Sequence, residues 1–103
     1  GTKCIEAEVK PISCNGAGST DNATIQYVKG DVVRIDVVAY NSFGAKKGNG
    51  STSTVPGPYR TAVVPFSGNT VQLDDTIKAY AVVEDSDGGA VICPPSSVEV
   101  TCE

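Results

Sequence analysis

The residues of this chain that most suggest chemistry are the acidic side chains of residues 84–89, which read EDSDGG. In a calcium loop that began at Asp85, Asp87 would fill the third position, but the fifth is glycine and the twelfth lacks the bidentate glutamate. A weak site would need further carboxylates, such as those of Asp74 and Asp75. An Asp-Gly pair between an alternating segment and an apolar run is instead typical of a hairpin turn, because both residues tolerate positive φ. We therefore predict a turn and no metal site here.

Groups for catalysis are scarce. The chain has no histidine, which rules out Ser-His-Asp and Cys-His arrangements. Carboxylate pairs for glycoside hydrolysis would have to come from acids such as Glu84 and Asp74, which flank turns where side chains are usually solvated. The sequence has neither a GxGxxG segment after a strand nor a phosphate-binding loop. It therefore predicts a non-enzymatic protein without a cofactor.

Four cysteines lie in two pairs, one near each end of the sequence: Cys4, Cys14, Cys93 and Cys102. Their spacings are much wider than the close pairs that bind zinc, so disulfides are the better interpretation. Two disulfides require an oxidising compartment, which predicts an extracellular or cell-surface protein. The glycosylation acceptor patterns at Asn22 and Asn49 agree with export.

Length and charge narrow the class further. A chain of 103 residues suits a single domain, residues 1–103, with one modest core. Its net charge of −4 argues against nucleic acid or an anionic membrane as partner. No segment approaches the ~18 to 20 continuous apolar residues that a membrane span needs, and the first ten residues lack the apolar centre of a signal peptide.

The elements that must position any site are strands. Residues 32–40 alternate, with Val33, Ile35, Val37 and Ala39 on one face, and residues 76–84 alternate in the same way. Weaker candidates are residues 4–9, 23–28, 59–66, 70–73 and 97–102. About seven short strands separated by turn residues predict an all-β fold, a β-sandwich of immunoglobulin-like type. Residues 41–58 are polar and glycine-rich, which predicts a long surface loop.

The two terminal cysteine pairs have nearly equal spacing, which suggests that the first and last strands lie side by side. In immunoglobulin-like sandwiches part of the first strand commonly runs parallel to the last, which would pair Cys4 with Cys93 and Cys14 with Cys102. Local pairing, Cys4 with Cys14 and Cys93 with Cys102, is the rival. Sequence alone does not choose among the three connectivities. In either case the fold is expected to be closed by disulfides at its termini.

Two stretches carry a resemblance. Residues 30–45, GDVVRIDVVAYNSFGA, resemble a strand and the Asn-x-Phe-Gly corner of bacterial and archaeal immunoglobulin-like surface domains. Residues 77–88, IKAYAVVEDSDG, are similar to the last hairpin of such modules. Most of these domains lack the four terminal cysteines. The resemblance implies a module of a surface protein, an adhesin or an extracellular filament.

Aromatic and basic side chains provide the binding candidates. If Tyr40 and Tyr80 share the solvent face of one sheet, they could form a platform for sugars; the alternative, which we favour, is that one hydroxyl bonds to backbone, as in a tyrosine corner. Phe43 and Tyr59 lie at the ends of the 41–58 segment, where we expect them to anchor it to the core rather than to bind a ligand. Lys46 and Lys47 are expected at a solvated loop tip, where they could meet an acidic partner.

These observations predict a secreted or cell-surface structural or adhesive module, such as a subunit of an extracellular filament that extends by pairing strand edges. Its partners would be copies of itself or other surface proteins. One alternative is a carbohydrate-binding module with polysaccharide as ligand. A further alternative is a small secreted inhibitor or effector that binds through residues 41–58.

Overall fold

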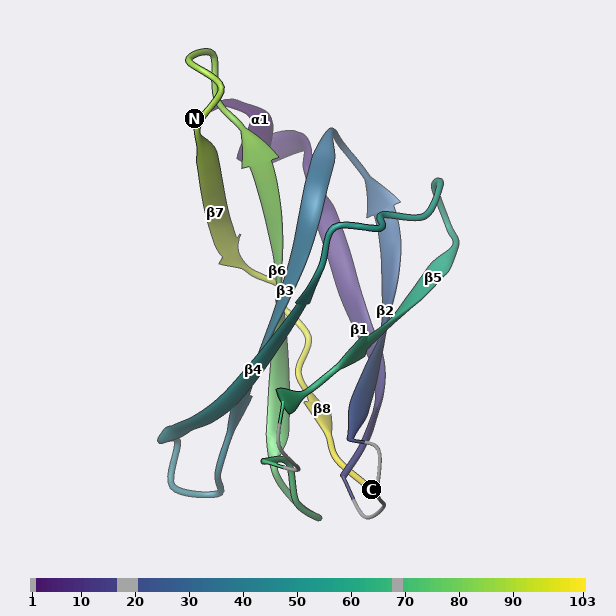
Figure 1. The fold of residues 1–103 in the computed structure, drawn as a ribbon, viewed down its shortest axis with the longest axis vertical. Coiled ribbons are helices and arrows are strands. Elements are labelled where there is room, and N and C mark those ends of the chain that lie inside the picture. Colours follow the sequence, from purple (N-terminus) through teal and green to yellow (C-terminus); the bar gives the residue numbers. More distant parts are fainter. Residues whose placement is uncertain (1, 17–20, 68–69) are drawn as a thin grey trace.

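The computed structural model describes residues 2–16, 21–67 and 70–103. This part of the chain is mostly β, which confirms the all-β prediction, although it has eight strands where about seven were predicted. The elements are α1 (Thr2–Glu6), β1 (Glu8–Asn15), β2 (Asn22–Lys29), β3 (Val32–Tyr40), β4 (Lys46–Thr52), β5 (Thr61–Pro65), β6 (Thr76–Glu84), β7 (Ala90–Pro95) and β8 (Val100–Thr101). They form two sheets that pack against each other along the long axis (Figure 1).

The two sheets are antiparallel throughout. The three-stranded sheet has the order β1-β2-β5. The five-stranded sheet has the order β4-β3-β6-β7, and β8 pairs with β6 below β7, so that β7 and β8 share one edge. The prolines of β7 therefore lie on an edge strand, where a missing backbone donor does no harm.

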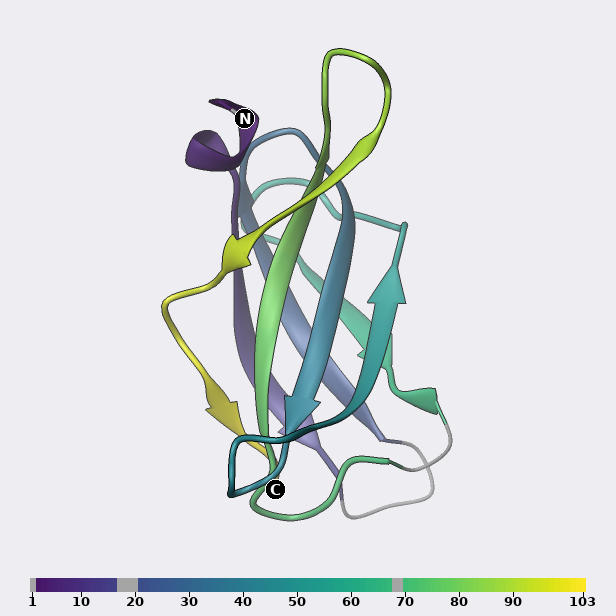
Figure 2. The same cartoon turned by 90° about the vertical axis from the view of Figure 1, so that its left-hand side faces the viewer.

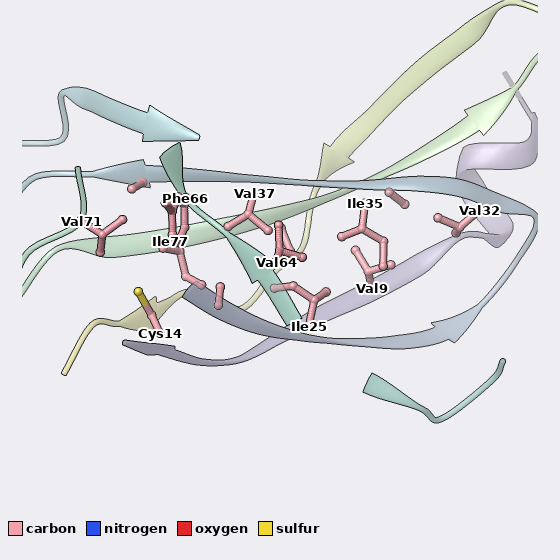
Figure 3. Close-up of a cluster of buried hydrophobic side chains, with 14 of the residues drawn as sticks. Val9, Cys14, Ile25, Val32, Ile35, Val37, Val64, Phe66, Val71 and Ile77 are labelled. Atoms are coloured by element: carbon pink, nitrogen blue, oxygen red, sulfur yellow. The ribbon is translucent and has the colours of Figure 1, made fainter. Parts of the chain in front are cut away.

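The core lies between the sheets and is built from alternate residues of the central strands. Ile25 of β2 and Val64 of β5 project from one sheet toward Ile35 and Val37 of β3 and Ile77 of β6 (Figure 3). All five side chains are fully buried. Each such burial contributes roughly 1.5–3 kcal/mol, so the alternation in the sequence dictates which face of each strand is covered.

One end of β3 departs from the predicted alternation. Val32 is buried and Val33 is 41% exposed, the reverse of the prediction that Val33 lies on the inner face. The cause is an irregularity in the pairing with β6 between Val32 and Arg34, where an extra residue shifts the side-chain alternation by one position. The prediction for Ile35, Val37 and Ala39 is confirmed, since all three are buried.

The predicted long loop at residues 41–58 is wrong in its central part, which forms strand β4 at the edge of the five-stranded sheet. Its glycines serve close packing rather than flexibility. A Cβ on Gly50 would collide with the carbonyl oxygen of Pro65, and one on Gly48 would collide with the side chain of Thr70. Composition could not distinguish this requirement from a loop, because the contacts join segments that are distant in sequence.

Three of the weaker strand predictions also need correction. The segment 4–9 begins in the helix α1 and only then enters β1. Residues 70–73 form no strand, although Val71 is buried against the core. Of residues 97–102, only Val100 and Thr101 pair in a sheet. In each case the segment is fixed by a disulfide or by packing, so that a full strand is unnecessary.

Two disulfides close one side of the fold, which we call the seam: the side where β1 lies beside residues 93–103 (Figure 2). Cys4 in α1 bonds to Cys93 in β7, and Cys14 in β1 bonds to Cys102. The pairing of the two termini is thus confirmed over local pairing. Glu103 donates to the Cys14 carbonyl and accepts from the Gly16 amide, at 3.0 Å each, in the pattern of a parallel pair.

The acidic segment 84–89 forms the β6–β7 turn, as predicted. Asp85 Oδ1 accepts hydrogen bonds from the amides of Asp87 and Gly89 at 3.0 and 2.8 Å. The β3–β4 turn repeats this arrangement, with Asn41 Oδ1 accepting from the amides of Phe43 and Ala45 at 2.9 and 3.0 Å. In both turns the fourth residue is a glycine with positive φ, so the same five-residue design caps two hairpins at opposite ends of the sheet.

Candidate binding face on the five-stranded sheet

Tyr40 and Tyr80 meet on the outer face of the five-stranded sheet. Their hydroxyl oxygens lie 2.9 Å apart. Each follows a core residue, Ala39 and Ala79, so alternation directs both tyrosines away from the core. The favoured expectation that one of them caps the core by a bond to backbone is wrong. Such a bond is made by Tyr27, whose hydroxyl donates to the Gly30 carbonyl.

A charged pair flanks the two tyrosines. Lys78 Nζ lies 5.2 Å from the centre of the Tyr40 ring and 3.2 Å from Glu99 Oε1. Partial burial, followed by the hydrogen bond with Tyr40 and the charge of Glu99, raises the pKa of Tyr80 to about 12. The Tyr80 hydroxyl is therefore neutral at physiological pH. In a hydroxyl pair only one proton bridges the two oxygens, which leaves the other free to donate to a ligand.

These tyrosines line a hollow of about 490 Å³ that crosses β4, β3, β6 and β7. Its polar lining comprises Arg34, Asp36, Lys46, Asn49, Ser51 and the two tyrosines, and Ile92 adds an apolar wall. A second hollow of about 330 Å³ lies on the other side of Tyr40, lined also by Thr76, Lys78 and Glu99. Tyr40 thus stands between two adjoining depressions, and we call this region the tyrosine face.

Arg34 and Asp36 give the tyrosine face a fixed polar group. Arg34 Nε and a terminal guanidinium nitrogen donate to the two Asp36 carboxylate oxygens at 2.8 and 3.1 Å. This bidentate bond to Asp36 raises the pKa of Arg34 above its ordinary value. Arg34 and Asp36 are two residues apart on β3, so their side chains project from the same face of the strand and the ion pair lies along it. The guanidinium has further N–H donors and the carboxylate has further lone pairs, so both could form hydrogen bonds with hydroxyls or amides of a ligand in the hollow.

The other predicted binding residues are dispersed. Phe43 sits at the tip of the β3–β4 turn with 93% of its surface exposed, and Tyr59 is 75% exposed beyond β4. The expectation that these rings anchor residues 41–58 to the core is therefore wrong. Lys46 lines the tyrosine face, whereas Lys47 forms a 2.7 Å ion pair with the buried carboxylate of Asp75. Lys47 therefore lies in strand β4 and pairs with a buried carboxylate, and the prediction that it sits at a solvated loop tip is wrong.

The carboxylates that a calcium site would need do not come together. One carboxylate oxygen of Asp85 accepts hydrogen bonds from the backbone of its own turn. Asp75 lies near the opposite end of β6, where it binds Lys47 and the Gln72 amide. Within residues 2–16, 21–67 and 70–103, no three His, Cys, Asp or Glu side chains are grouped to hold a metal ion. Of the two glycosylation candidates, Asn49 is exposed in the hollow, while Asn22 is half-buried in the middle strand of the other sheet.

Several residues of the tyrosine face were not singled out from the sequence. Arg34 and Asp36 carry a detectable signal, because opposite charges two residues apart on a strand share a face. Asn49 and Ser51 carry none, since they belong to a segment that reads as loop. Glu99 is brought in by the C-terminal connection, which no local pattern predicts.

Comparisons of this chain with protein-family models, with curated proteins and with solved structures found no match. Among the residues that the structure describes, the five-residue α1 is the only α-helix, and no helix is long and apolar enough to cross a membrane.

Proposed function

We propose that this chain is a non-enzymatic module of the extracellular space or a cell surface, with a β-sandwich of immunoglobulin-like type, and that it adheres through the tyrosine face. The observation that carries the proposal is the contact of Tyr40 and Tyr80 in a hollow of about 490 Å³. Two disulfides support the compartment, since such bonds persist where thiols are oxidised.

The side chains of this face are suited to binding because they are ordered before a ligand arrives. The tyrosines hold each other by their hydroxyls, and the Arg34–Asp36 and Lys78–Glu99 pairs hold the charged groups. A preorganised surface loses little side-chain entropy on association. Tyrosine also offers a large, rigid contact area with a polar end, which suits a surface that must stay soluble when free.

A carbohydrate-binding module is the second candidate, and the composition of the hollow favours it. Sugars need flat apolar surfaces for their C–H faces and fixed donors and acceptors for their hydroxyls. Tyr40 and Tyr80 offer the former, and Asn49 and the Arg34–Asp36 pair offer the latter. The inhibitor or effector alternative depended on a long loop at residues 41–58, and strand β4 takes its place.

A polysaccharide pull-down tests the proposal. Insoluble polysaccharides of several linkage types are incubated with the wild-type protein and with Tyr40→Ala, Tyr80→Ala and Tyr59→Ala. The last is the matched control, because Tyr59 is exposed and lies outside the hollow. We expect retention by at least one polysaccharide that falls more than 10-fold for the first two variants only. Equal retention of all four proteins would mean that adhesion uses another part of the surface. If no polysaccharide retains the protein but immobilised surface proteins do, the adhesive module is favoured over the carbohydrate-binding module.

Assembly into a filament is the remaining part of the proposal. The seam edges of the two sheets, β1 on one and β7 with β8 on the other, lie together and are tied by the two disulfides, so β4 and β5 are the edges outside the seam where another copy would pair. Sedimentation velocity over a range of concentrations, with electron microscopy of fast fractions, measures this directly. A strict monomer at high concentration would leave adhesion as the function and remove self-assembly.

A further inference from the structure

The two disulfides join the same two segments at both of their ends. Cys4 and Cys93 join α1 to β7, which lie toward one end of the long axis, and Cys14 and Cys102 join the end of β1 to the C-terminal residues at the other (Figures 1 and 2). Both segments therefore run in the same direction along the seam. Residues 15–92, which contain most of both sheets, form a closed loop that leaves this pair of segments and returns to it.

This topology determines the covalent path of a pulling force. Tension that enters before Cys4 and leaves after Cys102 divides between two arms, residues 4–14 and residues 93–102. It never has to pass through residues 15–92. Local pairing of the same cysteines would have produced the opposite result, with about 80 residues left in the path and free to extend.

From this we propose that the chain is a tension-bearing link: its disulfides carry an axial load past the two sheets, which stay folded and keep their binding surface while the molecule is stretched. The inference is independent of the proposed ligand. It goes beyond adhesion, because it assigns a mechanical role to the seam rather than to the tyrosine face.

The lengths of the arms fit this role. Each arm has about ten residues, which span at most roughly 33–36 Å when fully extended. The folded domain is 39 Å along its longest axis, and the part of β1 within the first arm, residues 8–14, already covers about 24 Å as a strand. The slack that remains lies mainly in α1 and in the turn after β7, and it is of the order of 10 Å. Because both arms are nearly equal, they become taut together and share the load.

The tyrosine face lies wholly outside the loaded arms, apart from Glu99 at its margin. Arg34 to Ser51 and Tyr80 to Ile92 all belong to the closed loop. Strands β3 and β4, which carry most of the hollow, contact neither arm through a ladder. Strand β6 is the exception, because Tyr80 pairs with Pro95 of the second arm. The covalent load path therefore bypasses the backbone of the hollow, and only the ladder between β6 and β7 joins the hollow to a loaded arm.

The test stretches single molecules by handles attached before Cys4 and after Cys102. Four proteins are compared: the wild type, Cys4→Ala/Cys93→Ala, Cys14→Ala/Cys102→Ala, and the variant lacking all four cysteines. Either disulfide alone confines the path to about ten residues, so the first three should reach a similar end-to-end length of about 40–50 Å at high force. The fourth should reach roughly 320–350 Å, about sevenfold longer, whether or not it is folded at rest.

A second readout reports on the fold under load. A fluorescent nanobody selected against the folded tyrosine face should stay bound to the stretched wild-type protein and leave the variant without cysteines. Extension of the wild type by 100 Å or more would overturn the proposed path. Release of the nanobody from wild-type protein at forces that the handles survive would show that the sheets do feel the load, and it would overturn the mechanical role. Loss of glycan binding in the pull-down would affect neither result.

Discussion

The two disulfides should stabilise the fold in a coupled way that can be worked out from their topology. A bridge across 89 residues stabilises by about 4.6 kcal/mol in the chain-entropy treatment. Once that bridge is closed, the second one closes a ring of only about 20 residues, made of the two arms of the seam, and contributes about 3.3 kcal/mol. The same holds when the order of closure is reversed, because the second separation is 88 residues.

A double-mutant cycle on the two disulfides measures this coupling. Replacing Cys4 and Cys93 by alanine should cost about 3.3 kcal/mol of unfolding free energy, and so should replacing Cys14 and Cys102. Removing both bridges should cost about 7.9 kcal/mol, which exceeds the two separate losses by about 1.3 kcal/mol. Alanine also leaves small cavities at the buried cysteines, but these losses cancel in the cycle since the bridges lie at opposite ends of the seam.

The assay is urea unfolding of the four proteins, followed by tyrosine fluorescence and far-ultraviolet circular dichroism. A fixed concentration of trimethylamine N-oxide in all samples keeps the least stable variant folded. A coupling of zero would refute the reasoning, because it would mean that the two bridges close independent loops. A negative coupling, in which one bridge contributes less to stability once the other has been removed, would refute it as well.

Further predictions concern the turn, the tyrosine pair and β4. Asp85→Ala should lower the unfolding free energy by about 1–2 kcal/mol because two backbone amides lose their acceptor, whereas Asp87→Ala should change it by less than about 0.5, and calcium should not raise the melting temperature. The raised pKa of Tyr80 means that stability falls as pH rises from about 10 to about 12, since only the unfolded state ionises in that window; Tyr80→Phe should lose that part of the fall in alkaline unfolding curves. Gly50→Ala should cost about 1–3 kcal/mol in thermal melts through its backbone collision, while Gly57→Ala, which meets open space, should be nearly silent.

The parts of the fold that the sequence predicts are those governed by local chemistry. Alternation in β3 and β6 fixes which residues enter the core, and equal cysteine spacing indicates that the two ends lie together. The hairpin at residues 84–89 follows from an aspartate that accepts bonds from its own turn. In each case the cause lies within a few neighbouring residues or in a simple match of lengths.

The parts that were missed depend on contacts between distant segments. The sequence of β4 resembles a loop because it is rich in glycine. These glycines are needed for close packing against Pro65 and Thr70, which lie 15 or more residues further along the chain. The side chain of Val33 points outward because the pairing of β3 with β6 is irregular between Val32 and Arg34, and the sequence around Val33 does not indicate this irregularity. The same limit applies to the tyrosine face. Alternation places Tyr40 and Tyr80 on solvent faces, but only the pairing of β3 with β6 brings their hydroxyls together.

The central claim is that the tyrosine face is where this module binds its ligand, and amide chemical-shift mapping tests it most directly. A ¹⁵N-labelled sample is titrated with soluble fragments of the polysaccharide that retains the protein, or with a soluble form of the protein partner to which it binds. We expect the shifted amides to cluster in residues 34–40, 46–51 and 78–80, with β1, β2 and β5 unchanged. Shifts confined to the three-stranded sheet, or to residues 53–60, would contradict the claim.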